Sequence, residues 1–493
     1  MTTSSQSVVR PNRYIDSVRL MHVSKRLSDH PGVTDAFVVM ATAANVAMAR
    51  GAGYRSDALA HAGPDDLLAC VTAIDPGTAE RVLDELDALL DEQPSGGRTA
   101  ATLEEAIAQA PDAGVVAISV PGSFAADLAM DSLDNGLNVF LFSSNVPLER
   151  EIELKAQAHR RGLIVMGPDC GTAIVSGAGL GFANGVRRGS IGVIGSSGTG
   201  MQSVTSLIHQ FGAGISHAIG VGSRDMTDEV GGTSTLDALD ALDADPTTEV
   251  IVVISKKIGD RVRPRLEQRL SASRKHIIEC HLAPGGPTLE ETARRAVAVA
   301  GVMQSSPIDE GVVPERRSPH PTRRYVRGLF AGGTFCYESQ MIALDAGLET
   351  RSNAPLLPHM LVADPDLSTG HCLIDMGSEG YTNGRPHPMI DARARCDRLM
   401  REGRDPETAV VLFDVVLGFG AAIDPAGDLV RALKEVEQDS DGEIVLLTSV
   451  CGTDLDPQGL DGQVKTLENA GVTVYPSNAA ATRAALQAVG VEP

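Results

Sequence analysis

Short apolar runs rich in β-branched residues alternate with helical patterns along most of this 493-residue chain. The runs are continuously apolar, which is typical of strands that are covered on both faces. Parallel sheets with helices on each side are therefore expected, and the predicted fold class is α/β. The predicted strands are residues 36–40, 115–120, 139–142, 163–166, 191–194, 249–254, 276–278, 409–417, 444–450 and 472–475.

Helices are predicted between these strands. One begins after the polar residue Thr102, and another covers 149–161 and ends at Gly162. Two more follow glycine-rich turns, over 201–211 and 335–344.

The clearest break in the pattern is 304–324, which holds four prolines and no apolar periodicity. This composition is typical of an interdomain linker. The chain repeats itself across it, because on each side a Gly-Thr turn precedes a helix and an Asp-Pro turn introduces a later strand. Two similar α/β lobes are expected, and the polar residues 1–12 are expected to form a flexible N-terminus.

The turn after the predicted strand 191–194 contains Gly195, Gly198 and Gly200. Glycine takes turn dihedrals that are barred to bulkier side chains. The amides of the following helical turn would then face an anion, and the helix dipole adds about 0.3–1 kcal/mol. By itself the turn fits a phosphate site and a purely structural turn equally well.

The composition and charge of the chain indicate which classes of partner it does not bind. The formal charge is −22 at pH 7, there is no tryptophan, and aromatic residues make up 3% of the chain. A chain this acidic repels nucleic-acid phosphates and membrane surfaces, so neither partner is expected. The seven cysteines are scattered singly, which is typical of a protein from a reducing compartment. The first dozen residues lack a signal sequence, and no apolar stretch reaches the ~20 residues of a membrane span. Together these observations predict that the protein is located in the cytoplasm. No spacing of His, Cys or acidic residues resembles a metal site.

Several motifs together resemble a known enzyme. Val-Pro-Gly-Ser-Phe-Ala-Ala-Asp at 120–127, Met-Gly-Pro-Asp-Cys-Gly at 166–171, Gly-Val-Ile-Gly-Ser-Ser-Gly-Thr at 192–199 and Asp-Pro-Thr-Thr-Glu-Val-Ile-Val at 245–252 occur in the order seen in the α subunit of succinyl-CoA synthetase. Leu-Ile-Asp-Met-Gly at 373–377 and the segment 405–420 resemble the C-terminal ligase domain of its β subunit.

Residues 14–485 as a whole are similar to the FdrA family, which fuses these two pieces and is related to the oxamate carbamoyltransferase subunit AllF. Gly-Arg-Pro-His-Pro-Met-Ile-Asp at 384–391 and Pro-Ser-Asn-Ala-Ala-Ala at 476–481 are specific to that family. The resemblance implies a Rossmann-like, CoA-binding-like N-terminal region over 13–187. Two flavodoxin-like parallel-sheet lobes follow, an α-like ligase lobe over 188–303 and a β-like ligase lobe over 325–493.

The resemblance also implies a phosphate site. In the synthetase, two helix N-termini face each other across the transferred phosphoryl group, which stabilises its charge without a covalent residue. The counterpart of this turn in the internal repeat is a further candidate anion site, in which backbone amides form a nest around the ligand. The alternative is that it is only a tight turn between a strand and a helix. The matching residues are Ser196, Ser197, Gly198 and Thr199 for the first helix start, Gly418, Phe419, Gly420 and Ala421 for the second, and Gly332, Gly333 and Thr334 for the repeat counterpart.

Two parts of the synthetase pattern do not match. Its ATP-grasp domain phosphorylates a histidine in a Gly-His-Ala-Gly segment, whereas no ATP-grasp-sized piece precedes the β-like half here and the corresponding stretch reads Glu-Cys-His-Leu-Ala-Pro-Gly-Gly at 279–286. His281 is a candidate substitute, with a structural histidine as the alternative. The loop that holds the CoA diphosphate is replaced by Met-Ala-Thr-Ala-Ala-Asn at 40–45. No cofactor is therefore assigned: phosphate or an acyl phosphate is the expected substrate, and CoA stays an alternative.

The expected activity is phosphorolysis, because phosphate as the nucleophile requires neither a phosphohistidine nor an ATP-grasp fold. FdrA relatives are linked to oxamate carbamoyltransferase, which converts oxalurate and phosphate into oxamate and carbamoyl phosphate in allantoin breakdown, with companion subunits. The resemblance thus implies an oligomeric transferase subunit. Two alternatives stay open, an ADP-forming acyl-CoA synthetase of the succinate–CoA ligase type and a non-catalytic assembly subunit.

Other polar residues follow predicted strands, at the carboxyl edge where open sheets place ligands. Arg224 is a candidate carboxylate clamp or a surface ion pair. His387 lies between two prolines and is either a substrate or subunit contact or part of a rigid turn. Cys170 is either a nucleophile or a packed thiol. The remaining candidates are Asn145 for substrate binding and Pro121, Pro168, Asp169 and Gly171 for a CoA-like edge.

Overall fold

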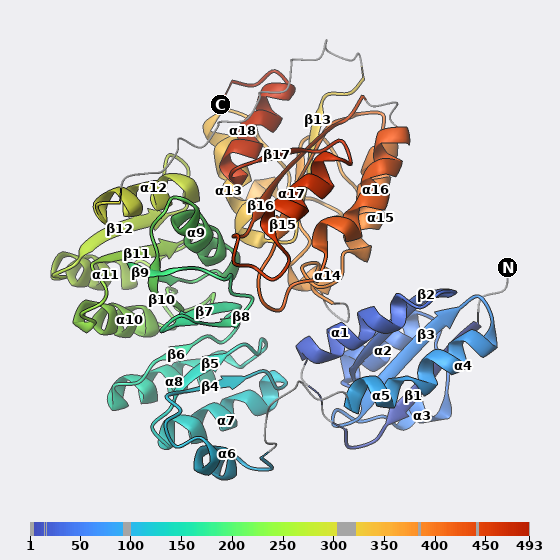
Figure 1. Cartoon of the computed structure of the whole chain (residues 1–493), viewed down its shortest axis with the longest axis horizontal. Helices are drawn as coiled ribbons and strands as arrows, with labels where there is room; N and C mark the ends of the chain where they lie inside the picture. Colours follow the sequence, from blue (N-terminus) through green and yellow to red (C-terminus); the bar gives the residue numbers. More distant parts are fainter. Residues whose placement is uncertain are drawn as a thin grey trace. The chain divides into compact units, whose positions relative to one another are not determined.

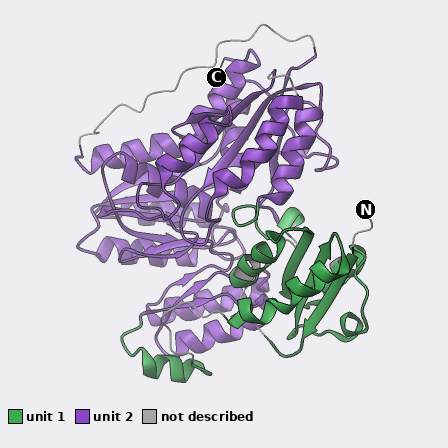
Figure 2. Ribbon diagram, turned by 45° about the vertical axis from the view of Figure 1, so that its right-hand side comes forward, with its two compact units in different colours: residues 1–113, 379–391 green, residues 114–378, 392–493 purple. Residues whose placement is uncertain are grey.

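The computed structural model describes residues 4–13, 15, 17–91, 100–302, 322–382, 386–439 and 443–492. The chain divides into two compact units (Figure 2). The first contains Met1–Ala113 and Glu379–Asp391, and the second contains Gly114–Ser378 and Ala392–Pro493.

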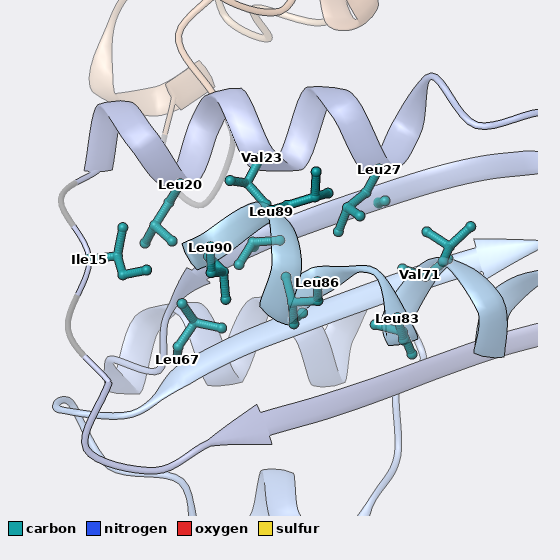
Figure 3. Packing of buried hydrophobic residues seen from close by; sticks show 14 of the residues in the cluster. Ile15, Leu20, Val23, Leu27, Leu67, Val71, Leu83, Leu86, Leu89 and Leu90 are labelled. Atoms are coloured by element: carbon teal, nitrogen blue, oxygen red, sulfur yellow. The ribbon is translucent and has the colours of Figure 1, made fainter. Parts of the chain in front are cut away.

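The first unit is a three-stranded antiparallel sheet covered by helices. Its strands lie in the order β1-β3-β2. Leu20, Val23 and Leu27 of the first helix pack with Leu86 and Val71 in a continuous apolar cluster (Figure 3). The elements are β1 (Ser4–Arg10), α1 (Ser17–Ser28), β2 (Val33–Met40), α2 (Ala43–Gly51), α3 (Asp57–His61), β3 (Leu67–Ala73), α4 (Pro76–Asp84), α5 (Leu86–Asp91), α6 (Leu103–Gln109) and α14 (Glu379–Thr382).

This unit differs from two sequence-based expectations. Residues 4–10 were expected to be flexible, but they form β1, which pairs along its whole length with β3. The expected single Rossmann-like region over 13–187 instead contains two strands of this antiparallel sheet, β2 and β3, and, in the second unit, a separate parallel sheet. The strand β1 is half-buried and carries three serines and a glutamine, so it has no continuous apolar run to reveal it.

The second unit holds three sheets, each packed against helices (Figure 1). The smallest has the order β4-β5-β6 and is parallel, the next has the order β12-β11-β9-β10-β7-β8, and the third has the order β14-β13-β15-β16-β17. Strands and helices of the first two are β4 (Val115–Ile118), α7 (Gly122–Asp134), β5 (Asn138–Leu141), α8 (Leu148–Arg161), β6 (Val165–Met166), β7 (Thr172–Val175), β8 (Ala178–Gly181), β9 (Arg188–Gly195), α9 (Gly198–Gln210), β10 (Ile215–Gly220), α10 (Thr233–Ala244), β11 (Val250–Ser255), α11 (Val262–Ser271), β12 (His276–His281) and α12 (Leu289–Val299).

The third sheet and its helices form the C-terminal lobe. Its elements are β13 (Tyr325–Phe330), α13 (Gly333–Asp345), the short 3₁₀ helix η1 (Pro358–Met360), β14 (Cys372–Asp375), α15 (Arg393–Arg404), β15 (Thr408–Val416), α16 (Pro425–Asp439), β16 (Val445–Cys451), α17 (Leu460–Glu468), β17 (Thr473–Tyr475) and α18 (Asn478–Ala488).

The internal repeat is visible in the strand order. Counting only parallel strands in chain order, the β9 lobe reads 2-1-3-4 and the β13 lobe reads 2-1-3-4-5. This is the flavodoxin-like order, in which ligands bind where the first and third strands lie side by side. Ligand sites are therefore expected at the carboxyl ends of β9 and β11 in one lobe and of β13 and β15 in the other.

The predicted α/β class is confirmed, and each of the ten predicted strands overlaps an observed one. Thr102 caps its helix by accepting the Glu105 amide at 3.2 Å, and Gly162 ends α8 in the left-handed conformation with φ of 67°. The proposed linker 304–324 lies outside the described residues except for 322–324. All seven cysteines are free, and no described helix is long and apolar enough to cross a bilayer.

A buried carboxyl joins the two large lobes of the second unit. Glu338 of α13 accepts the Leu289 amide at 2.7 Å and Asn478 Nδ2 at 2.8 Å. Burial raises the Glu338 pKa from 4.5 to about 7. The folded protein therefore keeps this proton to higher pH than the unfolded chain does.

This shift predicts a pH-dependent stability. Between about pH 4.5 and 7 the unfolded chain loses the Glu338 proton first, so the free energy of unfolding should fall as the pH rises through that window. Glu338→Gln should remove this contribution, so that the free energy of unfolding falls less steeply between these pH values than it does in the wild type. Urea unfolding at several pH values measures the two slopes. Glu468→Gln at an exposed site of α17 is the control, and an identical slope in the wild type and Glu338→Gln would contradict the assignment.

Candidate functional site

The starts of α9 and α13 meet inside the second unit. Ser197 Oγ hydrogen-bonds Thr334 Oγ1, and the Thr334 amide donates to Thr199 Oγ1 at 3.4 Å. A Cβ on Gly332 would lie 3.0 Å from the Thr199 methyl carbon. The helix start at 196–199 thus faces the repeat counterpart at 332–334, and the two turns touch through hydroxyl groups.

The start of α9 is rich in polar groups that lack protein acceptors. No side chain caps the helix, and the first amides of an α-helix have no acceptor within the helix. Thr172 Oγ1 is buried, has no hydrogen-bond partner, and would lie 3.2 Å from a Cβ placed on Gly198. Amides and a hydroxyl at this turn can therefore donate to an anion.

The start of α13 is already neutralised by the protein itself. Asp414 of β15, fully buried, accepts the amides of Ala331 and Gly332 through its two oxygens, each at 2.7 Å. Arg395 Nη2 lies 3.3 Å from the same carboxylate. The backbone nest expected here therefore exists, and it holds an internal carboxylate.

A second carboxylate stands beside this helix start. Asp375 ends β14, and a Cβ on Gly333 would lie 2.5 Å from Asp375 Oδ2. A larger residue at 333 would therefore force the Asp375 carboxylate to move. Burial raises the Asp375 pKa from 3.8 to about 6, partly offset by the nearby Lys256.

Residues 418–421 do not begin a helix, which corrects the expectation for them. The next helix, α16, begins at Pro425, whose fixed φ suits a first helical position. The Gly418 amide donates to Gln458 Oε1 at 3.1 Å, and the Phe419 amide donates to the Ala183 carbonyl at 2.8 Å. The turn, which also contains Gly420 and Ala421, holds the segment around Ala183 against the C-terminal lobe.

Cys170 and Arg224 serve the fold. Burial raises the Cys170 pKa to about 12, and its Sγ lies 3.4 Å from the Gly220 carbonyl, so it is a packed thiol. Arg224 Nε lies 2.8 Å from Glu151 Oε2, and its Nη2 donates to the Val146 carbonyl at 2.8 Å. The Cys170 thiol is therefore closed to a substrate, whereas the Arg224 side chain is 40% exposed and is held by these two contacts.

The carboxyl edge of the small parallel sheet is closely packed. A Cβ on Gly122, just after Pro121, would lie 2.4 Å from the Ser144 carbonyl oxygen. Asn145 is exposed with φ of 58°, and its Nδ2 donates to Ser144 Oγ at 3.4 Å. These described residues form a compact turn and supply no basic group for a CoA diphosphate.

The other residues expected at that edge lie closer to the helix starts. Asp169, after Pro168, accepts from Ser223 Oγ at 3.2 Å. A Cβ on Gly171 would lie 3.9 Å from the Gly198 Cα. Gly171 therefore borders the start of α9.

The two candidate histidines sit in different units. His281 ends β12, its Nδ1 lies 3.1 Å from Ser255 Oγ, and burial lowers its pKa. His387 belongs to the first unit, where its Nδ1 accepts the Met389 amide at 3.2 Å. That contact organises the proline-flanked turn. Among the described residues no His, Cys, Asp and Glu group could hold a metal ion.

Sequence reasoning missed Thr172, Lys256, Asp375 and Asp414. Lys256 comes two residues after the predicted strand 249–254, so the carboxyl-edge rule applied to that strand would have found it. The two aspartates lie within the motifs at 373–377 and 405–420, but nothing in the sequence distinguishes them from the other strand residues of those motifs. Thr172 gives no signal in sequence because its significance is a missing hydrogen bond.

Comparison with known proteins agrees with this architecture. A CoA-ligase family model matches residues 329–488, a CoA binding domain model matches 186–269, and a model of the AllF heavy metal-associated domain matches 1–107. The CoA-binding match therefore falls on the β9 lobe, whereas it was expected over 13–187.

Sequence relatives cover either the whole chain or one part of it. The uncharacterized protein YahF of Escherichia coli K12 is 39% identical, and the alignment covers 96% of each chain. The α subunit 2 of the ADP-forming succinate–CoA ligase of Archaeoglobus fulgidus is 27% identical over 32% of this chain, and the match spans 55% of that subunit. A solved structure, the dinucleotide-forming acetyl-coenzyme A synthetase 1 of Ca. Korarchaeum cryptofilum with phosphate and ADP, matches 81% of this chain and 86% of its own at 18% identity and a TM-score of 0.31. The chain thus contains CoA-ligase domains of the succinyl-CoA synthetase type.

Proposed function

The chain belongs to the FdrA family, and from that premise we propose that it is the phosphate-binding subunit of an acyl- or carbamoyl-transferring enzyme. The substrate class we favour is oxalurate with inorganic phosphate, giving oxamate and carbamoyl phosphate. The subunit would act in the cytoplasm as an oligomer with companion subunits. The AllF domain match and the polar start of α9 support this choice.

One contrast carries the proposal. The Ala331 and Gly332 amides before α13 are held by the Asp414 carboxylate, whereas the Ser196 amide before α9 donates to the Ile254 carbonyl and no carboxylate caps that helix start. Both turns have the same position in equivalent lobes, so the protein fills one anion site itself and leaves its counterpart to a ligand. Thr172, Ser197 and Thr199 add hydroxyl groups at that second site.

The chemistry needs no covalent protein residue. A phosphate oxygen would attack the carbamoyl carbon of oxalurate, forming a C–O bond while the bond from that carbon to the amide nitrogen breaks. The proton of hydrogen phosphate passes to the departing nitrogen, which leaves as oxamate. The α9 amides would orient the phosphate and stabilise the negative charge on its oxygens in the transition state.

Ser197→Ala combined with Thr199→Val tests this site. The pair removes two hydroxyl groups while keeping similar volumes, and we expect KM for phosphate to rise about 100-fold or more, because each of the two lost charge-assisted hydrogen bonds contributes roughly 1.5–3 kcal/mol. Carbamoyl phosphate formation from oxalurate would be measured with the full chain in its purified complex. Thr205→Val is the matched control, since Thr205 lies in the same helix and bonds only to carbonyls of that helix. Unchanged phosphate kinetics in the double variant would remove the α9 start from catalysis.

An ADP-forming acyl-CoA synthetase is the second candidate, supported by the CoA-ligase and CoA-binding family matches. Incubation with ATP, CoA and small dicarboxylates should then yield a thioester and an acid-labile phosphohistidine at His281. Inactivity with every acid, and no label in His281, would exclude it. A purely structural subunit would give neither reaction while still being required by its companions.

A further inference from the structure

A lysine stands at the strand crossover of the β9 lobe. Ile254 of β11 pairs with Gly195 of β9, and the Ser196 amide lies 3.4 Å from the Ile254 carbonyl oxygen. Lys256 comes two residues after Ile254, at the carboxyl edge of the central strand next to the α9 turn. In a sheet of this order, that edge is where ligands bind.

The Lys256 side chain reaches across to the other lobe. Its Nζ lies 5.2 Å from the centre of the Tyr337 ring, which belongs to the second turn of α13. Burial lowers the pKa of Lys256, and the Asp375 carboxylate, which lies against Gly333, partly offsets that shift by favouring the charged form. The Lys256 ammonium group therefore lies near the point where the starts of α9 and α13 meet.

A structural ion pair does not account for this lysine. Among the described residues, Lys256 Nζ lies over the Tyr337 ring, and no carboxylate is close enough to form an ion pair with it. Lys155 shows what a structural lysine looks like here, with Glu151 Oε1 at 2.9 Å and Asp225 Oδ1 at 2.8 Å. The equivalent crossover of the other lobe contains Asp414, whose carboxylate fills the nest from within.

We propose that Lys256 is a phosphate-binding residue, whose ammonium group contacts an oxygen of the phosphate held at the start of α9. This inference rests on the proposed function and adds the cation that the proposed site otherwise lacks. A cation at this position neutralises charge that hydroxyl groups and amides only partly offset. Asp375 would orient the ammonium group, and Tyr337 would limit its exposure to water.

Inorganic phosphate is the probe, and Lys256→Met the principal variant. Phosphate binding to the purified full chain would be measured by equilibrium dialysis, and carbamoyl phosphate formation in the complex would give KM for phosphate and kcat. We expect Lys256→Met to weaken phosphate binding at least 10-fold and Lys256→Arg to restore part of it. Lys257→Met is the matched control, because Lys257 is the exposed next residue.

A second readout separates binding from folding. Acetylation of the folded wild type, mapped by mass spectrometry, should slow at Lys256 when phosphate is added and stay constant at Lys257. Wild-type binding together with unchanged affinity in Lys256→Met would overturn the inference and leave the proposed function intact. Equal losses in the Lys256 and Lys257 variants, or no protection of Lys256, would also overturn it. A wild type that neither binds nor uses phosphate would overturn both.

Discussion

Replacing Lys155 by methionine is expected to lower the free energy of unfolding by about 3–5 kcal/mol, because it leaves the buried Asp225 carboxylate without its cation. Lys155 is 1% exposed, Glu151 1% and Asp225 0%. The lysine Nζ lies within 2.9 Å of an oxygen of each carboxylate and donates to the Val221 carbonyl at 2.9 Å. It therefore joins α8 to the segment that follows β10.

Urea unfolding of Lys155→Met, followed by circular dichroism, measures this loss. Lys434→Met, at an exposed position of α16, should change stability by less than about 0.5 kcal/mol. Glu151 would keep its ion pair with Arg224 at 2.8 Å in this variant. Asp225 would keep its bonds to the Ser234 and Thr235 amides at the start of α10. A Lys155 variant as stable as the Lys434 control would show that the network does not stabilise the fold.

Asp414→Asn is expected to cost a comparable amount, about 3–5 kcal/mol, because it removes the charge opposite the buried Arg395. Asparagine can accept only one of the two amides that Asp414 now accepts, so its NH₂ group would face the other. The loss should be concentrated at the start of α13, where hydrogen exchange of the Ala331 and Gly332 amides should accelerate.

Asp424→Asn provides the comparison for that variant. Asp424 accepts the Gly427 amide at 3.1 Å near the start of α16, where asparagine is nearly as good a cap. Its unfolding midpoint should stay within error of the wild type. Unchanged exchange at Ala331 and Gly332 in Asp414→Asn would mean that water or another group replaces the carboxylate without loss.

The contrast between the two helix starts could not be predicted from their sequences. Both turns contain glycine and threonine after an apolar strand, and the sequence correctly indicated that they are internal counterparts. Asp414 lies in β15 far along the chain from Gly332, and only the pairing of β13 with β15 brings them together. The same holds for Lys256 and Tyr337, which reach each other across two lobes.

The one large error in the expected site has a similar origin. Residues 418–421 follow a strand and contain two glycines, as a helix start does, but their φ values at Gly418 and Gly420 are 116° and 79°. Positive φ turns the chain away from helix, and Pro425 then sets the first helical residue. The local composition is compatible both with a helix start at 418–421 and with a turn before a helix that begins at Pro425, so it did not distinguish the two.

By itself, the sequence determined the α/β class, the ten apolar strands, the two-lobed repeat and the family. These features depend on local periodicity and on motifs that are read residue by residue. Tertiary structure alone decided that the polar segment 4–10 is a strand, that α13 faces α9, and which carboxylates and cations stand at their starts. The reason is physical: strand pairing and the burial of charge depend on partners that are distant in the chain, and local sequence carries no record of them.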